Sequence, residues 1–490
     1  MSETTTIREA VGDGAEGTHP MLLAGVATEG AESLPVIFPY DGSEIARVWL
    51  ADERQLDEAL RSAAAAEREI AAIPPFRRAE VLNAAAEIVR SRETELARQM
   101  TLETGNAIWE TRFEVQRTAE ILVTAAEEAR RITGEIVPVD AVPRGEGRYA
   151  YTKRFPVGTV LGITPFNAPL LLVAHKLGPA FASGNPCVIR PSSKTPLSAL
   201  SLGRILLEAG APRAAVSVVP CRTSLAEGLA TDPRVKFLTF TGSAQVGWRL
   251  KRIAATPRVT LELGGNGAVI VHSDANLDYA AERCAFGGFL RAGQACISVQ
   301  RLYVHESVLD AFTEKLLARV EGMKTGDPLD DDTVVGGLID EDAAAKAIVM
   351  VDDARAAGAR VLCGGTRQGT VVAPTLIVGA SEQARVCAEE AFAPIVALAS
   401  YDDVDEVIER ANDSPYGLQA GIFTNDIRII NRAFERLEVG GLIVNDVNTF
   451  RVDPMPYGGA KESGIGREGV RWAIREMTEE RLLVVDPRGA

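Results

Sequence analysis

A cysteine and a glutamate in two glycine-bearing segments are the residues of this sequence best suited to chemistry. Cys296 lies in FLRAGQACISVQR, residues 289–301, and Glu262 lies in LELGG, residues 261–265. An ionised thiol attacks electron-poor carbon, and a carboxylate takes a proton from a nucleophile or from water. A cysteine on its own is most often buried and inert, so the prediction depends on both segments together. The pair indicates covalent catalysis on a carbonyl group.

Two further segments accompany this pair, PFN at 165–167 and EEAFAP at 389–394. With them, the sequence resembles the NAD(P)-dependent aldehyde dehydrogenase superfamily from about residue 35 to its end. The resemblance implies an α/β protein with a Rossmann-like cofactor domain, a second α/β catalytic domain and a β oligomerisation arm. It also implies a small-molecule aldehyde as substrate and NAD or NADP as cofactor.

The resemblance assigns a catalytic role to three residues. Cys296 would form a thiohemiacetal and then a thioester, while the Asn167 amide and the Cys296 N–H stabilise the oxyanion. Glu262 would activate the deacylating water. A CoA-acylating semialdehyde dehydrogenase is an alternative, disfavoured because such relatives dispense with this base. A non-catalytic binding or structural protein of the same fold is another, disfavoured because Cys296, Glu262, Asn167 and Glu390 occur together.

The cofactor site is predicted from three segments. FTGSAQVG at 240–247 follows a strand-like run and opens a helix, so its backbone N–H groups suit a pyrophosphate. By resemblance, Gly242 and Ser243 contact the cofactor phosphates above Val246. Glu390 and Phe392 match residues that hold the nicotinamide ribose and ring. The complete set of expected cofactor contacts is Thr164, Pro165, Phe166, Arg190, Ser192, Ser193, Gly242, Ser243, Val246, Leu263, Gly264, Glu390 and Phe392.

The loop IRPSSKTP, residues 189–196, matches the segment that receives the adenosine ribose in the superfamily. A lysine and, three residues later, a glutamate that favours NAD are common there, whereas this sequence has Arg190 and Ser193. The missing carboxylate removes a repulsion against a 2′-phosphate, and Arg190 and Lys194 add positive charge. We therefore expect NADP to be tolerated, with NAD as an alternative because Ser193 can hydrogen-bond a ribose hydroxyl.

The substrate is less well defined. The tail from Asn445 resembles the branch holding lactaldehyde, phosphonoacetaldehyde and non-phosphorylating glyceraldehyde-3-phosphate dehydrogenases, many of whose substrates are small anions. Arg112, Arg291 and Arg451 could bind such a charge. An apolar pocket for an aliphatic or aromatic aldehyde could instead be formed by Trp109, Phe166, Ala168, Ala295, Ile297 and Phe450. Ala295 stands directly before the nucleophile, where an arginine would bind an anion closely, so both substrate classes stay open.

Composition narrows the classes of partner. A net charge of −15 disfavours nucleic acid, because no basic field would offset phosphate repulsion. The sequence has no uncharged apolar run of membrane-span length and no signal-peptide pattern, so no membrane partner and a cytoplasmic location are expected. Six cysteines and four histidines lack paired spacing, which predicts no metal site and no disulfide framework.

The 490 residues predict two or three domains. Residues 52–132 carry apolar residues at helical spacing, interrupted at Pro74 and Pro75. Beyond residue 155, β-branched runs alternate with helical ones, which predicts parallel sheets. The expected strands lie within 158–164, 186–191, 215–220 and 235–240, and then 267–271, 301–305, 359–363 and 440–445.

From these patterns and the resemblance we expect a flexible N-terminus at 1–20. A cofactor-binding domain would comprise 21–130 and 150–261, and a catalytic domain 262–460. An oligomerisation arm and C-terminal segment would comprise 131–149 and 461–490. The lone strand-like pieces 131–140 and 480–486 would extend a neighbouring subunit's sheet, so we predict a homodimer or homotetramer.

Overall fold

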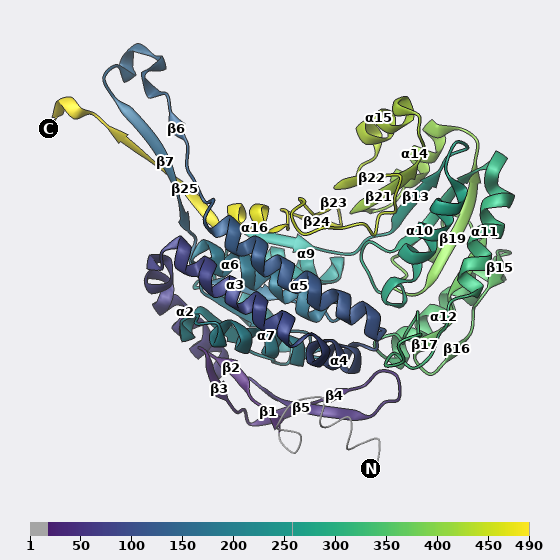
Figure 1. Ribbon diagram of the computed structural model, residues 1–490, viewed down its shortest axis with the longest axis horizontal. Helices are drawn as coiled ribbons and strands as arrows, with labels where there is room; N and C mark the ends of the chain where they lie inside the picture. Colours follow the sequence, from purple (N-terminus) through teal and green to yellow (C-terminus); the bar gives the residue numbers. More distant parts are fainter. Residues whose placement is uncertain (1–17, 257, 490) are drawn as a thin grey trace.

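Two helix-covered β-sheets stand beside each other, and a narrow β arm projects from the first of them (Figure 1). This computed structural model describes residues 18–256 and 258–489. The expected flexible N-terminus lies outside the described residues up to position 17. Thr18–His19 form strand β1, which pairs in parallel with β5 (Glu44–Leu50). β4 (Glu32–Ile37) completes this small sheet on the other side of β5.

The first large sheet has eight strands in the order β24-β12-β11-β8-β9-β10-β2-β3. Its five central strands are parallel, and three of them are buried along their whole length, as a sheet covered on both faces requires. They are β8 (Val160–Ile163), β9 (Cys187–Arg190), β10 (Val216–Val218), β11 (Phe237–Thr241) and β12 (Val259–Glu262). The antiparallel flanking strands are β2 (Met21–Leu23), β3 (Val26–Thr28) and β24 (Gly464–Ile465). All four strands expected before residue 241 are confirmed.

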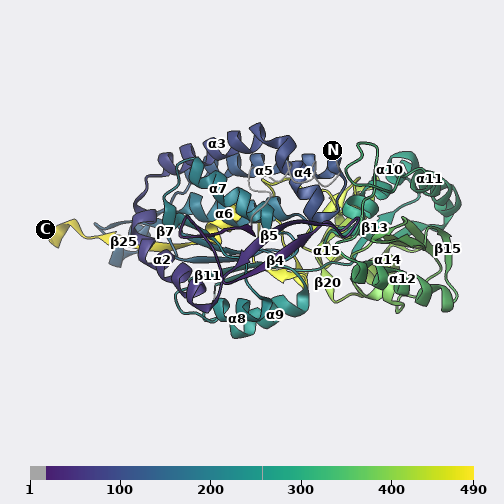
Figure 2. The same cartoon turned by 90° about the horizontal axis from the view of Figure 1, so that it is seen from below.

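Helices cover both faces of this sheet (Figure 2). One face carries α3 (Pro75–Ser91), α4 (Glu93–Thr104), α5 (Ile108–Ala129), α6 (Pro169–Ser183) and α7 (Pro196–Glu208). The other face carries α2 (Glu53–Ala72), α8 (Thr223–Ala230) and α9 (Ala244–Ile253). The helical prediction for 52–132 is confirmed, with the first break at Pro74, where proline cannot continue the preceding helix.

The second large sheet has seven strands in the order β15-β18-β19-β14-β13-β21-β22. They are β13 (Gly267–Val271), β14 (Val299–His305), β15 (Arg360–Cys363), β18 (Thr375–Val378), β19 (Ile395–Tyr401), β21 (Gln419–Phe423) and β22 (Gly441–Val444). Residues 359–363 were expected within a parallel series, and this is wrong in one respect. β15 pairs antiparallel with β18, because no crossover helix separates the two strands.

The second sheet also has helices on both faces, joined by short structures. The helices are α10 (Leu277–Phe289), α11 (Leu309–Glu321), α12 (Glu341–Ala356), α13 (Arg385–Ala388), α14 (Val404–Asn412) and α15 (Ile427–Arg436). The shorter strands are β16 (Arg367–Gln368), β17 (Val371–Val372), β20 (Tyr416–Gly417) and β23 (Ala460–Lys461). The C-terminal segment returns from this part to the first sheet, where it supplies β24 and α16 (Val470–Glu476).

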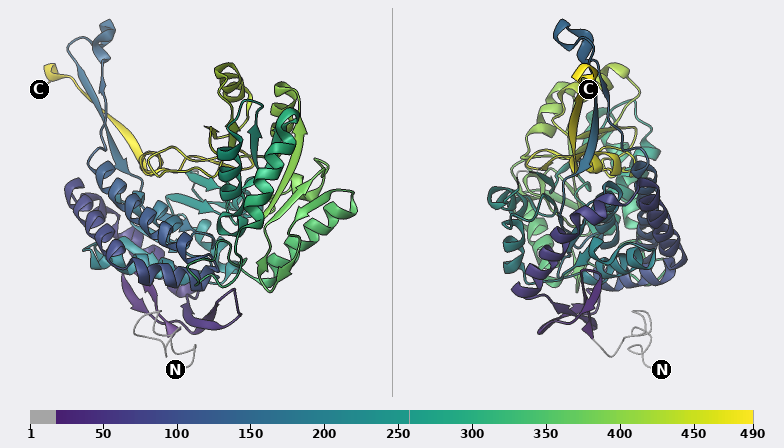
Figure 3. Two further views of the ribbon diagram at one scale, coloured as in Figure 1. Left: turned by 45° about the vertical axis from the view of Figure 1, so that its right-hand side comes forward. Right: turned by 90° about the vertical axis from the view of Figure 1, so that its left-hand side faces the viewer.

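The arm is an antiparallel ribbon that extends away from both large sheets (Figure 3). It consists of β6 (Ile136–Val137), β7 (Tyr149–Pro156) and β25 (Thr478–Val485), in the order β25-β7-β6. Several of its apolar side chains are exposed in the single chain: Ile136, Val142, Tyr149, Tyr151, Leu482, Leu483 and Val484. A ribbon with apolar residues exposed on both faces lacks the cover that water-facing strands normally have.

Candidate active site

The sheet of the first unit positions two of the predicted catalytic residues at one edge. Asn167 lies in the loop between β8 and α6, and Glu262 is the last residue of β12. Both loops leave the carboxyl ends of parallel strands, where open α/β sheets commonly bind their ligands. The Asn167 side chain is anchored, because its Nδ2 donates to the carbonyl oxygen of Gln294 over 2.8 Å.

Cys296 reaches the same place from the second unit, in the loop between the 3₁₀ turn Leu290–Gly293 and β14. Arg291, Ala292 and Gly293 have φ values of 53°, 52° and 74°, so three consecutive residues are left-handed. This conformation is unfavourable for residues with a Cβ and persists only where the surroundings hold it. Gly265 allows the loop after β12 to pack against Cys296, since a Cβ there would lie 2.2 Å from the Cys296 carbonyl oxygen.

All three predicted catalytic side chains line one cavity of about 290 Å³. Its walls come from the first sheet, the second unit and the C-terminal segment. The lining residues are Pro165, Phe166, Asn167, Leu172, Thr241, Gly242, Ser243, Glu262, Leu263, Gly264, Cys296, Glu390, Phe392, Arg451, Tyr457 and Glu468. A cavity with apolar walls and a few convergent polar groups is the usual form of a small-molecule site.

Glu262 has the environment of a proton acceptor. It is 3% exposed, and neither of its carboxylate oxygens has a hydrogen-bond partner among the described residues. Burial raises the pKa of Glu262 well above its ordinary value, and the negative charge of Glu468 raises it further. Glu468 itself stays ionised: burial alone would raise its pKa, but Lys176, His175 and Arg451 lower it to about 2.

A buried network of charges lies beside the cavity and was missed by the sequence analysis. Arg451 contacts Glu468 at 3.2 Å and His175 at 3.1 Å, and Lys176 also contacts Glu468 at 3.2 Å. Asp453 continues the network, at 3.2 Å from His175 and 2.6 Å from Arg117. The one signal in the sequence was the pair His175 and Lys176 inside the apolar helical run PLLLVAHKLGPAFAS, where an ionisable residue needs a partner.

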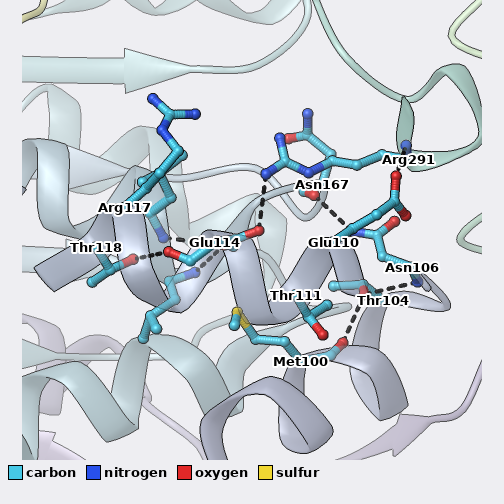
Figure 4. A network of polar contacts seen from close by, with 12 residues as sticks. Met100, Thr104, Asn106, Glu110, Thr111, Glu114, Arg117, Thr118, Asn167 and Arg291 are labelled. Atoms are coloured by element: carbon cyan, nitrogen blue, oxygen red, sulfur yellow. Dashed lines mark hydrogen bonds and ion pairs between the residues drawn. The ribbon is translucent and has the colours of Figure 1, made fainter. Parts of the chain in front are cut away.

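A second polar network ties the cysteine loop to α5 and α6 (Figure 4). Glu114 of α5 accepts hydrogen bonds from the N–H groups of Leu170 and Leu171 in the first turn of α6, each at 3.1 Å. The same carboxylate pairs with Arg291 at 3.2 Å, and the Arg291 N–H donates to Glu110. These contacts hold the strained turn before Cys296 against the helix that follows Asn167.

The predicted cofactor residues fall into two places. Pro165, Phe166, Gly242, Ser243, Leu263, Gly264, Glu390 and Phe392 line the cavity. Thr164, Arg190, Ser192, Ser193 and Val246 are outside its lining, and Arg190 lies at the end of β9 beside Ile163. The Arg190 guanidinium donates to the Cys221 carbonyl and the Thr223 hydroxyl, each at 3.2 Å, while its Nε has no partner among the described residues. Lys194 is turned away, 3.1 Å from Asp340.

Of the predicted substrate residues, Arg451 lines the cavity together with Cys296. Arg112 instead pairs on the surface with Asp331 at 2.7 Å, and Arg291 pairs with Glu114. Trp109 lines a separate hollow of about 280 Å³ with residues of α10 and α11. Phe166 also lines the cavity, whereas Ala168, Ala295, Ile297 and Phe450 are outside its lining.

Two features of other protein classes are absent from the part of the chain that the structure describes. No helix in it has the length and apolar character needed to span a membrane. No three His, Cys, Asp or Glu side chains within residues 18–256 and 258–489 are grouped as metal ligands.

Comparison with known proteins agrees with this geometry. Residues 26–483 match the aldehyde dehydrogenase family. The chain is 44% identical to the 3-sulfolactaldehyde dehydrogenase of Priestia aryabhattai over 457 residues, covering 93% of this chain and 95% of the relative. It is 39% identical to the aspartate-semialdehyde dehydrogenase 1 of Pseudomonas canavaninivorans, covering 93% of this chain and 97% of the relative. The structure of aldehyde dehydrogenase 21 from Physcomitrella patens, in complex with the reaction product succinate, superimposes with a TM-score of 0.94. It is 42% identical and covers 96% of this chain and 98% of that one.

The fold and the site therefore define the class of protein: an oxidoreductase with two α/β units that share a cavity. The chain belongs to the aldehyde dehydrogenase family. It oxidises an aldehyde with NAD or NADP, as the resemblance in the sequence implied.

Proposed function

We propose that Cys296 carries the substrate covalently during this oxidation. The thiolate attacks the aldehyde carbon, and the resulting oxyanion is stabilised by the Asn167 amide and the Cys296 N–H. The support is that Asn167 and Cys296 line the same cavity, with the Asn167 amide held against the cysteine loop. When bound, the nicotinamide supplies the hydride acceptor, and Cys296 then holds the acyl group as a thioester.

Glu262 is the proposed base for thioester hydrolysis. Both of its oxygens are free of protein hydrogen bonds in the described part of the chain, so no protein donor competes with water for them. Its raised pKa brings its basicity closer to what proton transfer from water requires near neutral pH. A CoA-acylating enzyme has no need of such a carboxylate, so water is the favoured acyl acceptor.

The residues at the cavity's other end fit a dinucleotide. Ser243 precedes α9, and its side chain makes no capping hydrogen bond to this helix. The first turn also has no acidic residue, so its N–H groups can receive a pyrophosphate. Glu390 is held close to Gly264, with its Oε1 accepting from the Gly265 N–H at 3.0 Å. The position of Arg190, at the carboxyl end of β9, supports binding of the adenosine end.

The substrate we propose is a short-chain aldehyde with an anionic group at its other end. The observation that carries this is Arg451, a cationic residue that lines the cavity of Cys296. Burial alone would lower the pKa of Arg451, but Glu468, Tyr457 and Asp453 raise it, so the charge is permanent. The names of the relatives support an anion: a sulfonated aldehyde, aspartate semialdehyde and the dicarboxylate succinate.

A matched pair of four-carbon aldehydes tests this proposal. Succinic semialdehyde and butanal differ in one carboxylate, so their kcat/KM ratio measures the contribution of the charge. Arg451→Gln is expected to lower kcat/KM for succinic semialdehyde by about 10- to 100-fold, the range for a hydrogen bond to a charged group. The loss on butanal should be smaller, because butanal has no anionic group for Arg451 to bind. Arg112→Gln, which alters an exposed ion pair, is the control. Equal losses on both aldehydes would contradict an anion site at Arg451.

We further propose that the chain forms a homodimer or homotetramer. In the arm, Ile136 is 88% exposed and Leu482 is 58% exposed, and β22 is an edge strand of the second large sheet within the described residues. Both features favour contact with a second copy of the chain, in which the arm of one copy lies beside the sheet of the other, which covers the arm's exposed apolar residues. All six cysteines are free thiols, which supports action in a reducing compartment such as the cytoplasm.

A further inference from the structure

Tyr457 touches the proposed nucleophile. Its hydroxyl oxygen lies 3.1 Å from the Cys296 sulfur, and both side chains line the central cavity. Tyr457 is 3% exposed, whereas Cys296 is partly exposed towards the cavity. The Tyr457 hydroxyl has no other hydrogen-bond partner among the residues that the structure describes. This contact belongs to none of the roles assigned so far to Asn167, Glu262 or Arg451.

The direction of this hydrogen bond depends on the state of the sulfur. With a neutral thiol either atom can be the donor. Once the sulfur is ionised it has no proton, so the Tyr457 O–H must donate to it. Hydrogen bonds to a charged acceptor are about twice as strong as neutral ones, so the contact favours the thiolate over the thiol.

Arg451 makes Tyr457 a better donor. Its guanidinium lies 3.7 Å from the centre of the Tyr457 ring, as a cation stacked on the aromatic face. A positive charge in that position polarises the phenol O–H towards the sulfur. The ring is also fixed from its backbone, because Tyr457 and Glu468 exchange two main-chain hydrogen bonds of 3.0 and 2.6 Å.

The other charges around the sulfur make this donor important. Burial raises the pKa of the Cys296 thiol to about 11; the Tyr457 hydrogen bond opposes this, while the negative charge of Glu390 adds to the rise. Arg451 acts in the same direction as Tyr457, and Glu262 acts in the same direction as Glu390. Two carboxylates therefore disfavour the thiolate, and one hydroxyl and one arginine favour it.

We propose that the Tyr457 hydroxyl donates a hydrogen bond to the Cys296 thiolate and holds it, ready to react, in the cavity, with Arg451 stacked on the ring to strengthen the donor. Tyr457 is then a further catalytic residue, since it touches the reacting atom. The proposal rests on the proposed function only in taking Cys296 as the nucleophile. Arg451 would serve twice, at the substrate anion and at the sulfur.

Alkylation of the enzyme without aldehyde tests this directly. Iodoacetamide reacts with the thiolate, forming a carbon–sulfur bond and releasing iodide, so its rate is proportional to the thiolate fraction, which grows as pH rises. The rate at Cys296 is read by peptide mass spectrometry between pH 7 and 9.5 for wild type and Tyr457→Phe. Tyr279→Phe, which alters an exposed tyrosine of α10, is the control.

Tyr457→Phe is expected to alkylate about 10-fold more slowly than wild type at each pH, while Tyr279→Phe matches wild type. Removing one oxygen widens the space beside the sulfur, so hindered access does not produce slower alkylation. An unchanged or faster rate in Tyr457→Phe would overturn the proposal. Melting temperature and NADP binding show that the variant is folded, and a per-molecule rate is independent of its yield.

A second assay, aldehyde oxidation by Cys296→Ala, separates this proposal from the proposed function. If Cys296 were not the nucleophile, Cys296→Ala would keep its aldehyde oxidation. The alkylation rates would still report the Tyr457 contact, because they need no turnover. A slower rate in Tyr457→Phe together with active Cys296→Ala would thus retain the hydrogen bond and reject the covalent mechanism.

Discussion

Glu114 and Arg291 form a buried ion pair, 3.2 Å between carboxylate and guanidinium, that joins α5 to the turn before Cys296. The Glu114 side chain is 1% exposed and that of Arg291 is 11% exposed. Arg291 was one of three arginines expected to bind a substrate anion. From this ion pair we propose instead that it supports the cysteine loop, whose residues 291–293 are all left-handed.

Arg291→Ala should therefore act on stability and on every substrate alike. Removing Arg291 leaves Glu114 buried without its ion pair, and such changes reduce the free energy of unfolding by about 3–5 kcal/mol. Chemical denaturation measures that loss, and kcat should fall for succinic semialdehyde and butanal in the same proportion. Arg112→Ala, which removes an exposed partner, should change stability by less than about 0.5 kcal/mol. A stable Arg291→Ala enzyme that loses only the anionic substrate would show that Arg291 is a clamp after all.

The pKa of Glu262 predicts how thioester hydrolysis depends on pH. Because burial and the charge of Glu468 raise this pKa, Glu262 is protonated, and inactive as a base, below the raised value. Hydrolysis should speed up as pH rises through it and slow down as pH falls. Glu468→Gln removes a negative neighbour and should shift the profile to lower pH. Single-turnover decay of the acyl-enzyme between pH 6 and 10 is the measurement, and an unmoved profile would contradict the assignment.

Arg190 is expected to set the preference between the two cofactors. Arg190 lies at the carboxyl end of β9, where open α/β sheets bind their ligands, whereas Lys194 is committed to Asp340. Arg190→Gln should weaken NADP binding by about 10-fold and leave NAD binding within about 2-fold, because only NADP has the 2′-phosphate. Lys194→Gln should affect neither. Fluorescence titration gives the dissociation constants, and equal weakening of both cofactors would assign Arg190 a structural role.

The arm is expected to be an interface between copies. Leu482→Asp places a charge on the exposed face of β25 and should reduce the mass seen by analytical ultracentrifugation to that of a smaller assembly. Val349→Asp is the matched control, since Val349 is also an exposed apolar residue, 48% exposed, but lies on α12. If Leu482→Asp keeps the wild-type mass, the interface lies elsewhere.

Local patterns allowed much of the site to be predicted. The Cys296 and Glu262 segments, Asn167 and the glycine turn before α9 each have a signature within a few residues. The cavity that unites them could also be expected, because carboxyl ends of parallel strands meet at one sheet edge. The helices within residues 52–132 could be predicted from the helical spacing of their apolar residues, and the structure has helices there.

The charges around the cavity could not be predicted in the same way. Arg112 and Arg117 both lie on α5, but five helical positions turn the chain by about 140° beyond a full turn, so they face different directions. Arg112 faces outward to Asp331, whereas Arg117 faces inward to Asp453. That contact joins residues 336 positions apart in the sequence, and no local pattern indicates it. Likewise, no local pattern in the sequence indicates the contact between Tyr457 and Cys296.

The most direct test of the covalent mechanism is to trap the acyl-enzyme. Glu262→Gln, given NADP and whichever of succinic semialdehyde or butanal turns over faster, should reduce one cofactor per active site and then stall. Intact-protein mass spectrometry should show the mass of one acyl group, and peptide mapping should place it on Cys296. Continued turnover by Glu262→Gln, or an acyl group on another of the six cysteines, would contradict the account.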